Sequence, residues 1–280
     1  MPITRKYKIR DGDYVFDSEA ENNHIDYHAD RFEENYRAEK KHFWFISRLE
    51  RIIGVFNNYI SIENSILEIG CGTAMIAQAL KEKGYNIDIS DLHRKSLQYA
   101  KQKGIEKRYQ FNLFNAPFES EYDVIAMFDV FEHIDDDIKA MKNIFKILKP
   151  EGWIILTVPA HMFLWNREDR ISHHKRRYNK KRLKAILKQA GFQIVYSRYI
   201  FQLIMPLLLL RKILKPDSKN EVSREEYLKS KSINRFVNSI LLFLCRIEAK
   251  IHRLIPDIFG GSILLAARKN NDFREPYAYK

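Results

Sequence analysis

The segment from residue 65 to residue 74, Ser-Ile-Leu-Glu-Ile-Gly-Cys-Gly-Thr-Ala, constrains the fold of this chain more than any other part. Its apolar half predicts a strand, and Gly70 and Gly72 then allow a tight turn into a helix and close approach of a ligand to the backbone. The spacing is close to the dinucleotide fingerprint G-x-G-x-x-G, but Met75 stands at the third glycine, so that fingerprint fails. Asp91 follows about 20 residues later, at the end of the next predicted strand, where an acid can bind a ribose.

Apolar strands and amphipathic helices alternate over most of the chain. The run at 122–128 is apolar apart from Asp123, as is typical of a strand covered on both faces. Alternating strands and helices imply right-handed crossovers and a mainly parallel sheet. The sequence therefore predicts an α/β fold, a Rossmann-like sheet of seven strands with helices on both faces. The expected strands are 66–69, 86–90, 109–113, 122–128, 153–158, 192–196 and 262–267.

The glycine segment resembles the first motif of class I S-adenosylmethionine-dependent methyltransferases. That motif is an acid, any residue, Gly, any residue, Gly, and residues 68–72 read Glu-Ile-Gly-Cys-Gly. Ala74 stands where the family often has a third glycine, and residues 129–133, Asp-Val-Phe-Glu-His, resemble the signature that follows the fourth strand. The resemblance covers roughly residues 42–196 and returns near residue 262. It implies S-adenosyl-L-methionine as cofactor and a seventh strand that lies antiparallel beside the fifth.

Two further segments resemble a bacterial subgroup, the type 11/12-like methyltransferases, whose members often accompany surface saccharide or lipid pathways. Residues 42–48 read His-Phe-Trp-Phe-Ile-Ser-Arg, and residues 159–178 include Asp169 and the run His-Lys-Arg-Arg-Tyr. The aromatic segment is expected to form either a lid over substrate or a helix packed on the sheet edge. Asp169 and Arg177 are expected either to face substrate or to pair with each other.

Ligands of such sheets bind beyond the carboxyl ends of the strands. Amides of the glycine loop and of the helix that follows can meet the methionine carboxylate, and Asp91 can accept both ribose hydroxyls. By resemblance, Asn112 stands near the adenine, where the family often has Asp. The predicted cofactor-binding residues are Glu68, Gly70, Cys71, Gly72, Asp91, Leu92, Asn112, Leu113, Phe128 and Asp129.

Methyl transfer from a sulfonium needs mainly alignment of the acceptor, and a hydroxyl acceptor can also need a general base. The candidate catalytic residues are His133, His161 and His174, with a structural role for His133 as the alternative. The sequence shows no metal-ligand spacing. His173 and His174 are adjacent and do not share a helical face, so no metal site is predicted.

A long excursion separates the last two expected strands. Residues 200–210 are strongly apolar but too short to span a bilayer, which needs about 20 residues. Residues 233–251 predict a second apolar-rich helix. The pair is expected either to cap the site or to enter a membrane interface, where basic residues meet anionic lipid. The expected division is 1–60 N-terminal extension or lid, 61–198 methyltransferase core, 199–258 helical insertion, and 259–280 last strand and tail.

The chain has a formal net charge of +12, and its basic residues concentrate between residues 167 and 184. Such a stretch can bind nucleic acid, anionic lipid or a phosphorylated substrate, or it can be a solvated helix face. The concentration comprises Arg167, Arg170, Lys175, Arg176, Arg177, Lys180, Lys181, Arg182 and Lys184.

Two cysteines, Cys71 and Cys245, form no disulfide framework, and the polar N-terminus lacks a signal-peptide core. We therefore expect a cytoplasmic protein, with peripheral binding to the inner membrane face as a further expectation. The function expected is methyl transfer from S-adenosylmethionine to a small-molecule or lipid-linked acceptor, which includes saccharides. An RNA methyltransferase and a noncatalytic cofactor-binding protein are the alternatives.

Overall fold

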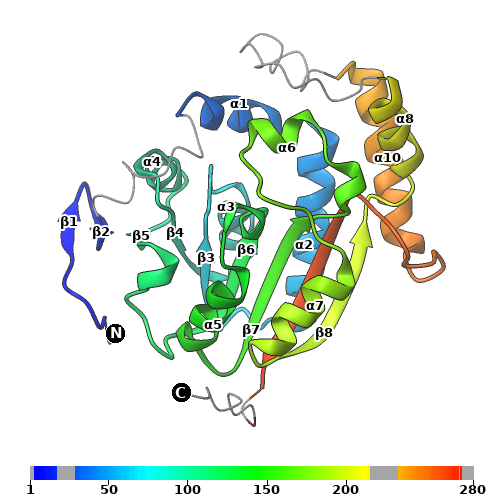
Figure 1. Cartoon of the computed structure of the whole chain (residues 1–280). Helices are drawn as coiled ribbons and strands as arrows, with labels where there is room; N and C mark the ends of the chain where they lie inside the picture. Colours follow the sequence, from blue (N-terminus) through cyan, green and yellow to red (C-terminus); the bar gives the residue numbers. More distant parts are fainter. Residues whose placement is uncertain (1–2, 18–28, 215–232, 271, 273–280) are drawn as a thin grey trace.

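A nine-stranded sheet runs through the computed structural model, which describes residues 3–17, 29–214, 233–270 and 272 (Figure 1). The strand order is β1-β2-β5-β4-β3-β6-β7-β9-β8, and β9 runs antiparallel to both of its neighbours. The seven expected strands are present, and the predicted antiparallel seventh strand is confirmed. The strands are Lys8–Arg10 (β1), Asp13–Val15 (β2), Ser65–Ile69 (β3), Asn86–Ser90 (β4), Arg108–Gln110 (β5), Tyr122–Phe128 (β6), Leu148–Pro159 (β7), Phe192–Ile200 (β8) and Ser262–Lys269 (β9).

Two strands of the N-terminal segment extend the sheet beyond the seven that the sequence predicts. β2 pairs in parallel with β5, and β1 pairs antiparallel with β2. Asp13 accepts a hydrogen bond from Arg108 at 2.6 Å, and both side chains are buried. Each strand has only three residues, too few for a periodic pattern to show. The beginning of the expected lid is therefore part of the sheet edge.

Helices cover both faces of the sheet, and each face has its own apolar core. Phe56, Leu80 and Leu97, from α2, α3 and α4, belong to one core, whereas Met141 and Leu183, from α5 and α7, belong to the other. The helices are Ala29–Glu39 (α1), Phe43–Tyr59 (α2), Met75–Glu82 (α3), Arg94–Gln102 (α4), Asp137–Ile147 (α5), Arg167–Ile171 (α6), Lys180–Gln189 (α7), Met205–Leu214 (α8) and Arg235–Ile251 (α10), with short 3-10 helices at Leu113–Asn115 (η1), Phe131–His133 (η2) and Met162–Leu164 (η3).

The strand order places the ends of four parallel strands beside one another. β3 lies between β4 and β6. The chain therefore adds β4 and β5 on one side of β3 and then crosses over to add β6 and β7 on the other side. Crevices at such a reversal of strand order are the usual ligand sites of open α/β sheets. The loops after β3, β4, β5 and β6 are those in which the sequence predicts the cofactor residues.

The described part of the helical insertion lies at one side of the molecule, where α8 and α10 appear together (Figure 1). α10 packs against α2. Its Asn238 side chain accepts from the amide of Phe43 and donates to the carbonyl of Lys41, both at 2.9 Å. In the ranges that the structure describes, no helix has the length and apolarity needed to cross a bilayer.

Candidate active site

A cavity of about 1420 Å³ opens at the carboxyl ends of the central strands. Its lining includes every predicted cofactor residue, the start of α2, the loop from η3 through Arg177, and parts of α8 and α10. A ligand site for one small molecule typically measures about 300–1,000 Å³. This cavity therefore has room for a cofactor and an acceptor together.

The glycine loop is held tightly on one side and is open on the other. Gly70 has φ +74°, and its amide donates to the carbonyl of Ser90 at 2.8 Å. A Cβ added at Gly70 would lie 2.5 Å from a methyl group of Val130. Gly72 has φ +56°, and a Cβ there would have no atom within 4 Å. The second glycine thus leaves backbone accessible to a ligand.

Asp91 is buried at the end of β4 and closes the glycine loop. Its carboxylate accepts from the amide of Gly72 at 3.0 Å and from the amide of His93 at 2.9 Å. Burial raises the pKa of Asp91 despite these bonds. A carboxylate has about four lone-pair positions, so acceptor capacity remains for two hydroxyl groups of a ligand.

Glu68 and Asn112, two other predicted cofactor residues, differ in how the protein engages them. Glu68 is buried, burial raises its pKa to about 8, and its Oε2 has no hydrogen-bond partner. Asn112 Oδ1 accepts from the amide of Phe114 at 2.9 Å and so caps η1. Leu92 and Leu113 line the cavity beside them.

Asp129 is fixed by a residue whose role the sequence did not reveal. It has φ +55° directly after β6, and one carboxylate oxygen accepts from Thr157 Oγ1 at 2.9 Å. The other oxygen is paired with the guanidinium of Arg48 in α2. Arg48 belongs to the aromatic segment that the sequence singles out, but nothing in the sequence indicates this partner. The segment therefore both packs on the sheet and reaches the site.

The three candidate catalytic histidines do not come together. His133 and His174 line the cavity, with ring centroids 4.8 Å apart. His161 is absent from the described cavity lining, and its ring stacks on Tyr199 at 4.8 Å. Burial, with a contribution from Arg177, lowers the pKa of His161. Of the three candidates, His133 and His174 therefore border the cavity, and His161 does not.

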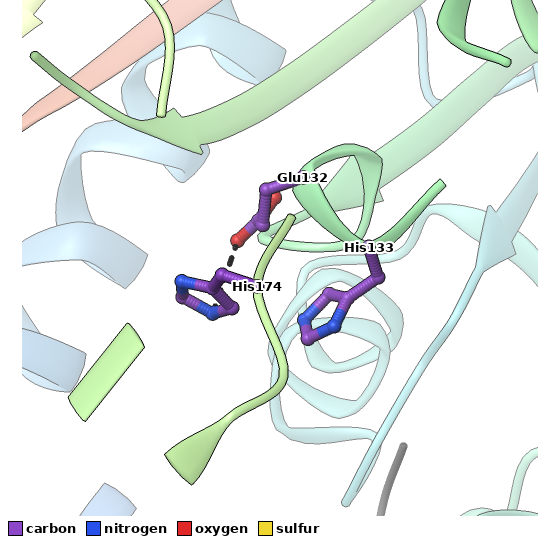
Figure 2. A group of neighbouring side chains, drawn as sticks. All are labelled: Glu132, His133 and His174. Atoms are coloured by element: carbon purple, nitrogen blue, oxygen red, sulfur yellow. Dashed lines mark ion pairs between the residues drawn. The ribbon is translucent and has the colours of Figure 1, made fainter. Parts of the chain in front are cut away.

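His174 belongs to a network of titratable side chains on the cavity wall. Its Nε2 lies 3.8 Å from Glu132 Oε1 (Figure 2), and its Nδ1 lies 2.8 Å from Asp169 Oδ1. Arg177 contacts both oxygens of Asp169 at 2.8 Å, which is the pairing that the sequence left as one of two alternatives. Burial raises the pKa of Asp169, but hydrogen bonds from His174 and Arg177 outweigh it and hold that pKa below its usual value.

The basic stretch around this loop is largely engaged with acids of the same chain. At least five of its nine cations form ion pairs, which reduces the positive charge available to a polyanion. The pairs are Lys175 with Asp135, Arg176 and Arg182 with Asp137, Arg177 with Asp169, and Lys180 with Asp257.

Comparisons with known proteins agree with this fold. A ubiquinone biosynthesis O-methyltransferase of Rickettsia felis is 28% identical over 114 residues, which cover 39% of this chain and 46% of the relative. The chain thus spans about half the length of the curated relatives it matches.

Solved structures of methyltransferases share the fold. A possible histamine N-methyltransferase of Thermotoga maritima has a TM-score of 0.57 and 16% identity, covering 88% of this chain and 98% of that one. Phosphoethanolamine N-methyltransferase 2 of Haemonchus contortus, in complex with S-adenosyl-L-methionine, has a TM-score of 0.51 and 19% identity, covering 79% of this chain and 53% of that one.

A family model described as a methyltransferase domain matches residues 36–197, which is more than half of the chain. The match contains the glycine loop, Asp91, Asp129 and the candidate histidines His133 and His174. The chain therefore belongs to the methyltransferase domain family, and its fold is that of the class I S-adenosylmethionine-dependent methyltransferases.

Proposed function

We propose that this chain transfers a methyl group from S-adenosylmethionine to a small-molecule or lipid-linked acceptor, with lipid-linked saccharides included. One observation carries the proposal: a single cavity joins the glycine loop to an apolar wall formed by α8 and α10. The part of the cavity at the glycine loop suits the cofactor, and the part along α8 and α10 suits an acceptor with an apolar portion. The names of the curated relatives, which are O-methyltransferases, support an oxygen as the methylated atom.

The residues at the glycine loop fit the proposed cofactor. Gly72 leaves an accessible backbone position, and the buried carboxylate of Asp91 has lone pairs for ribose hydroxyls. Leu113 and Phe128 supply apolar surface on the cavity wall, which suits a purine ring. The bound cofactor would supply a methyl group on a reactive sulfonium.

Other residues that line or support the cavity would position the acceptor and accept its proton. Arg48 and Thr157 keep the carboxylate of Asp129 in place at the end of β6. The imidazole of His174 is oriented by Asp169 and borders the cavity together with His133. A hydroxyl acceptor next to these rings would find a nitrogen that can take its proton. Residues of α2, α8 and α10 also line the cavity and would contact the acceptor.

The acceptor class is inferred from the helices of the insertion. Leu207 in α8 and Val237 in α10 both line the cavity and are 48% and 45% exposed. The apolar surface therefore continues from the cavity to the outside of the molecule. On α10, Phe236, Ile240 and Phe243 are exposed at a spacing that places them on one helical face.

An RNA acceptor receives less support from the same geometry. Binding to nucleic acid depends on cations that can neutralise phosphates. Five cations of the basic stretch instead pair with acids of this chain. The apolar rim of the cavity also suits a lipid better than a polyanion.

Asp91→Ala is expected to weaken binding of S-adenosylhomocysteine at least a hundredfold. Two charge-assisted hydrogen bonds to the ribose, each about 1.5–3 kcal/mol, would be lost. The substitution would also release the Gly72 amide. Calorimetry measures the affinity, and Asp123→Ala serves as control. Asp123 holds Ser65 and Lys149 at the opposite end of the sheet, so its loss should leave the affinity unchanged. Equal affinity of the Asp91 variant and the wild type would contradict the assigned site.

The exposed face of α10 is expected to hold the protein on anionic vesicles. Burying a large apolar side chain contributes roughly 1.5–3 kcal/mol, so Phe236→Ser with Phe243→Ser should reduce binding at least tenfold. Vesicle flotation measures the bound fraction, and added salt should lower it because Arg235 and Lys250 lie on the same helix. Ile62→Ser, at a 58% exposed site next to β3, is the matched control.

If the variant with both Phe substitutions binds anionic vesicles as well as the wild type does, the proposed membrane contact through α10 is wrong. The acceptor class has its own measurement, in which labelled S-adenosylmethionine is incubated with the protein and a membrane lipid extract. Label is expected in the lipid fraction, and it should disappear in the Asp91→Ala variant. Transfer only to water-soluble metabolites would restrict the acceptor to small molecules.

A further inference from the structure

Glu132, His133 and His174 form a cluster on the cavity wall that nothing in the proposed cofactor site requires. One ligand-type atom of each residue lies within 4.8 Å of those of the other two. Figure 2 shows that the cluster joins two segments, with Glu132 and His133 on η2 and His174 on the loop after α6. We infer that these three side chains bind a divalent transition-metal ion of the zinc type.

The carboxylate of Glu132 gives the strongest reason for a cation. The side chain is fully buried, and neither carboxylate oxygen has a hydrogen-bond partner. A buried polar group without a partner is costly, and native structures seldom contain one without a functional reason. The neighbouring cations are already paired, Arg48 with Asp129 and Arg177 with Asp169. A bound metal ion would supply the missing partner.

His174 is already oriented as a metal ligand. Its Nδ1 lies 2.8 Å from Asp169 Oδ1, which leaves Nε2 directed toward Glu132. Metal-binding histidines commonly hold a carboxylate with the second ring nitrogen, which fixes the tautomer and the ring orientation. Here Arg177 in turn holds both oxygens of Asp169. The outer support that such a ligand needs is therefore built into the fold.

The two segments that carry the ligands are fixed relative to each other. The amide of Lys175 donates to the carbonyl of Glu132 at 3.0 Å. The rings of Phe131 and Tyr178 stack at 5.4 Å beneath them. The ligand atoms now lie within 4.8 Å of one another. A tetrahedral site with bonds of about 2.05 Å needs them roughly 3.3 Å apart, so we propose that the side chains draw together around the ion.

Two histidines and one glutamate are a donor set typical of catalytic zinc sites, which keep a position open for water or substrate. All three residues line the cavity, so an open position would face the acceptor. With the ion bound, His133 and His174 would act as ligands rather than as proton acceptors, and the ion would instead lower the pKa of a bound hydroxyl. This consequence rests on the proposed function, whereas metal binding itself does not. The sequence predicted no metal site because the ligands come from segments far apart in the chain.

Metal binding is tested on the full chain after chelator treatment, without cofactor or acceptor. Titration with Zn²⁺ in a calorimeter is expected to give one site per chain. Glu132→Gln keeps the shape of the side chain but removes a direct ligand. Its Zn²⁺ affinity should therefore fall by more than the roughly 10–100-fold that is lost when a residue hydrogen-bonded to a ligand is removed. His174→Ala should abolish it. His252→Gln, at a histidine on the far end of α10, controls for general histidine binding.

Co²⁺ offers a second measurement, because its visible absorption reports ligand number. The wild type should give an absorbing complex that Zn²⁺ displaces, and Glu132→Gln should not. Far-UV circular dichroism checks that each variant is folded. Failure of the wild type to bind Zn²⁺, or wild-type affinity in Glu132→Gln, would overturn the inference. A chain that binds Zn²⁺ but transfers no methyl group would overturn the proposed function and leave the metal site standing.

Discussion

Gly70→Ala is expected to destabilise the fold severely, whereas Gly72→Ala is expected to fold and to lose the cofactor. At Gly70 the new Cβ would lie 2.5 Å from one Val130 methyl and 3.0 Å from the other. Valine is stiff about χ1, so the clash cannot relax cheaply. Overpacking costs about 1–3 kcal/mol, and the left-handed backbone adds about 1–2 kcal/mol. Urea unfolding should show a loss of roughly 2–5 kcal/mol.

Gly72→Ala carries only the second of these costs, because no atom lies within 4 Å of its new Cβ. That methyl group would occupy the space through which a ligand approaches the loop. S-adenosylhomocysteine should therefore bind at least tenfold more weakly, as calorimetry measures. Gly84→Ala is the matched control. Gly84 has a φ of +89° and open surroundings, but it lies outside the cavity. Gly84→Ala should therefore carry the same backbone strain as Gly72→Ala and leave the affinity for S-adenosylhomocysteine unchanged. Normal binding by Gly72→Ala would contradict the proposed placement of the cofactor.

The sequence could predict the parts of the fold that depend on local pattern. The glycine loop, Asp91 and the central strands each follow from residue type and spacing within a short segment. β1 and β2 could not be predicted, since three residues each give no period and their pairing with β5 is non-local. The resemblance to a known family, rather than periodicity, supplied the antiparallel last strand, which the structure confirms.

The candidate site divides in the same way. Residues of the cofactor half follow strands directly, so their place at the sheet edge was predictable. The pairing of Arg48 with Asp129 joins an N-terminal helix to the end of β6 and leaves no trace in spacing. His161 follows β7 as expected, yet a left-handed φ of +59° turns its ring onto Tyr199. The roles of all the candidate site residues remain predictions that the proposed measurements test.

One contact of the helical insertion could not be predicted from the sequence. Both of its apolar segments were recognised, but not the buried acid that joins α10 to the core. Glu248 is 1% exposed, and it pairs with Arg51 of α2 at 2.9 Å. Its two oxygens also accept from the amides of Phe201 and Leu203 at 2.9 Å, at the exit from β8. One carboxylate therefore ties together α10, α2 and the segment that leads to α8.

Glu248→Ala is expected to lower the free energy of unfolding by about 3–5 kcal/mol, as removal of one partner from a buried ion pair typically does. Arg51 would keep a charge that is 12% exposed, and two amides would lose their acceptor. Glu248→Gln should cost less, because its amide oxygen can still accept one of these bonds. Urea titration measures all three proteins.

Glu50→Ala is the control for this effect, since it removes a neighbouring ion pair between the same two helices. Glu50 and Arg246 are 40% and 52% exposed, and a pair of that kind contributes about 0–1 kcal/mol. A double-mutant cycle between Arg51→Ala and Glu248→Ala should then show strong coupling, because the second substitution removes the unpaired charge that the first one exposes. If Glu248→Ala costs no more than Glu50→Ala, α10 is not anchored through this carboxylate, and its apolar packing and the hydrogen bonds of Asn238 hold the helix in place.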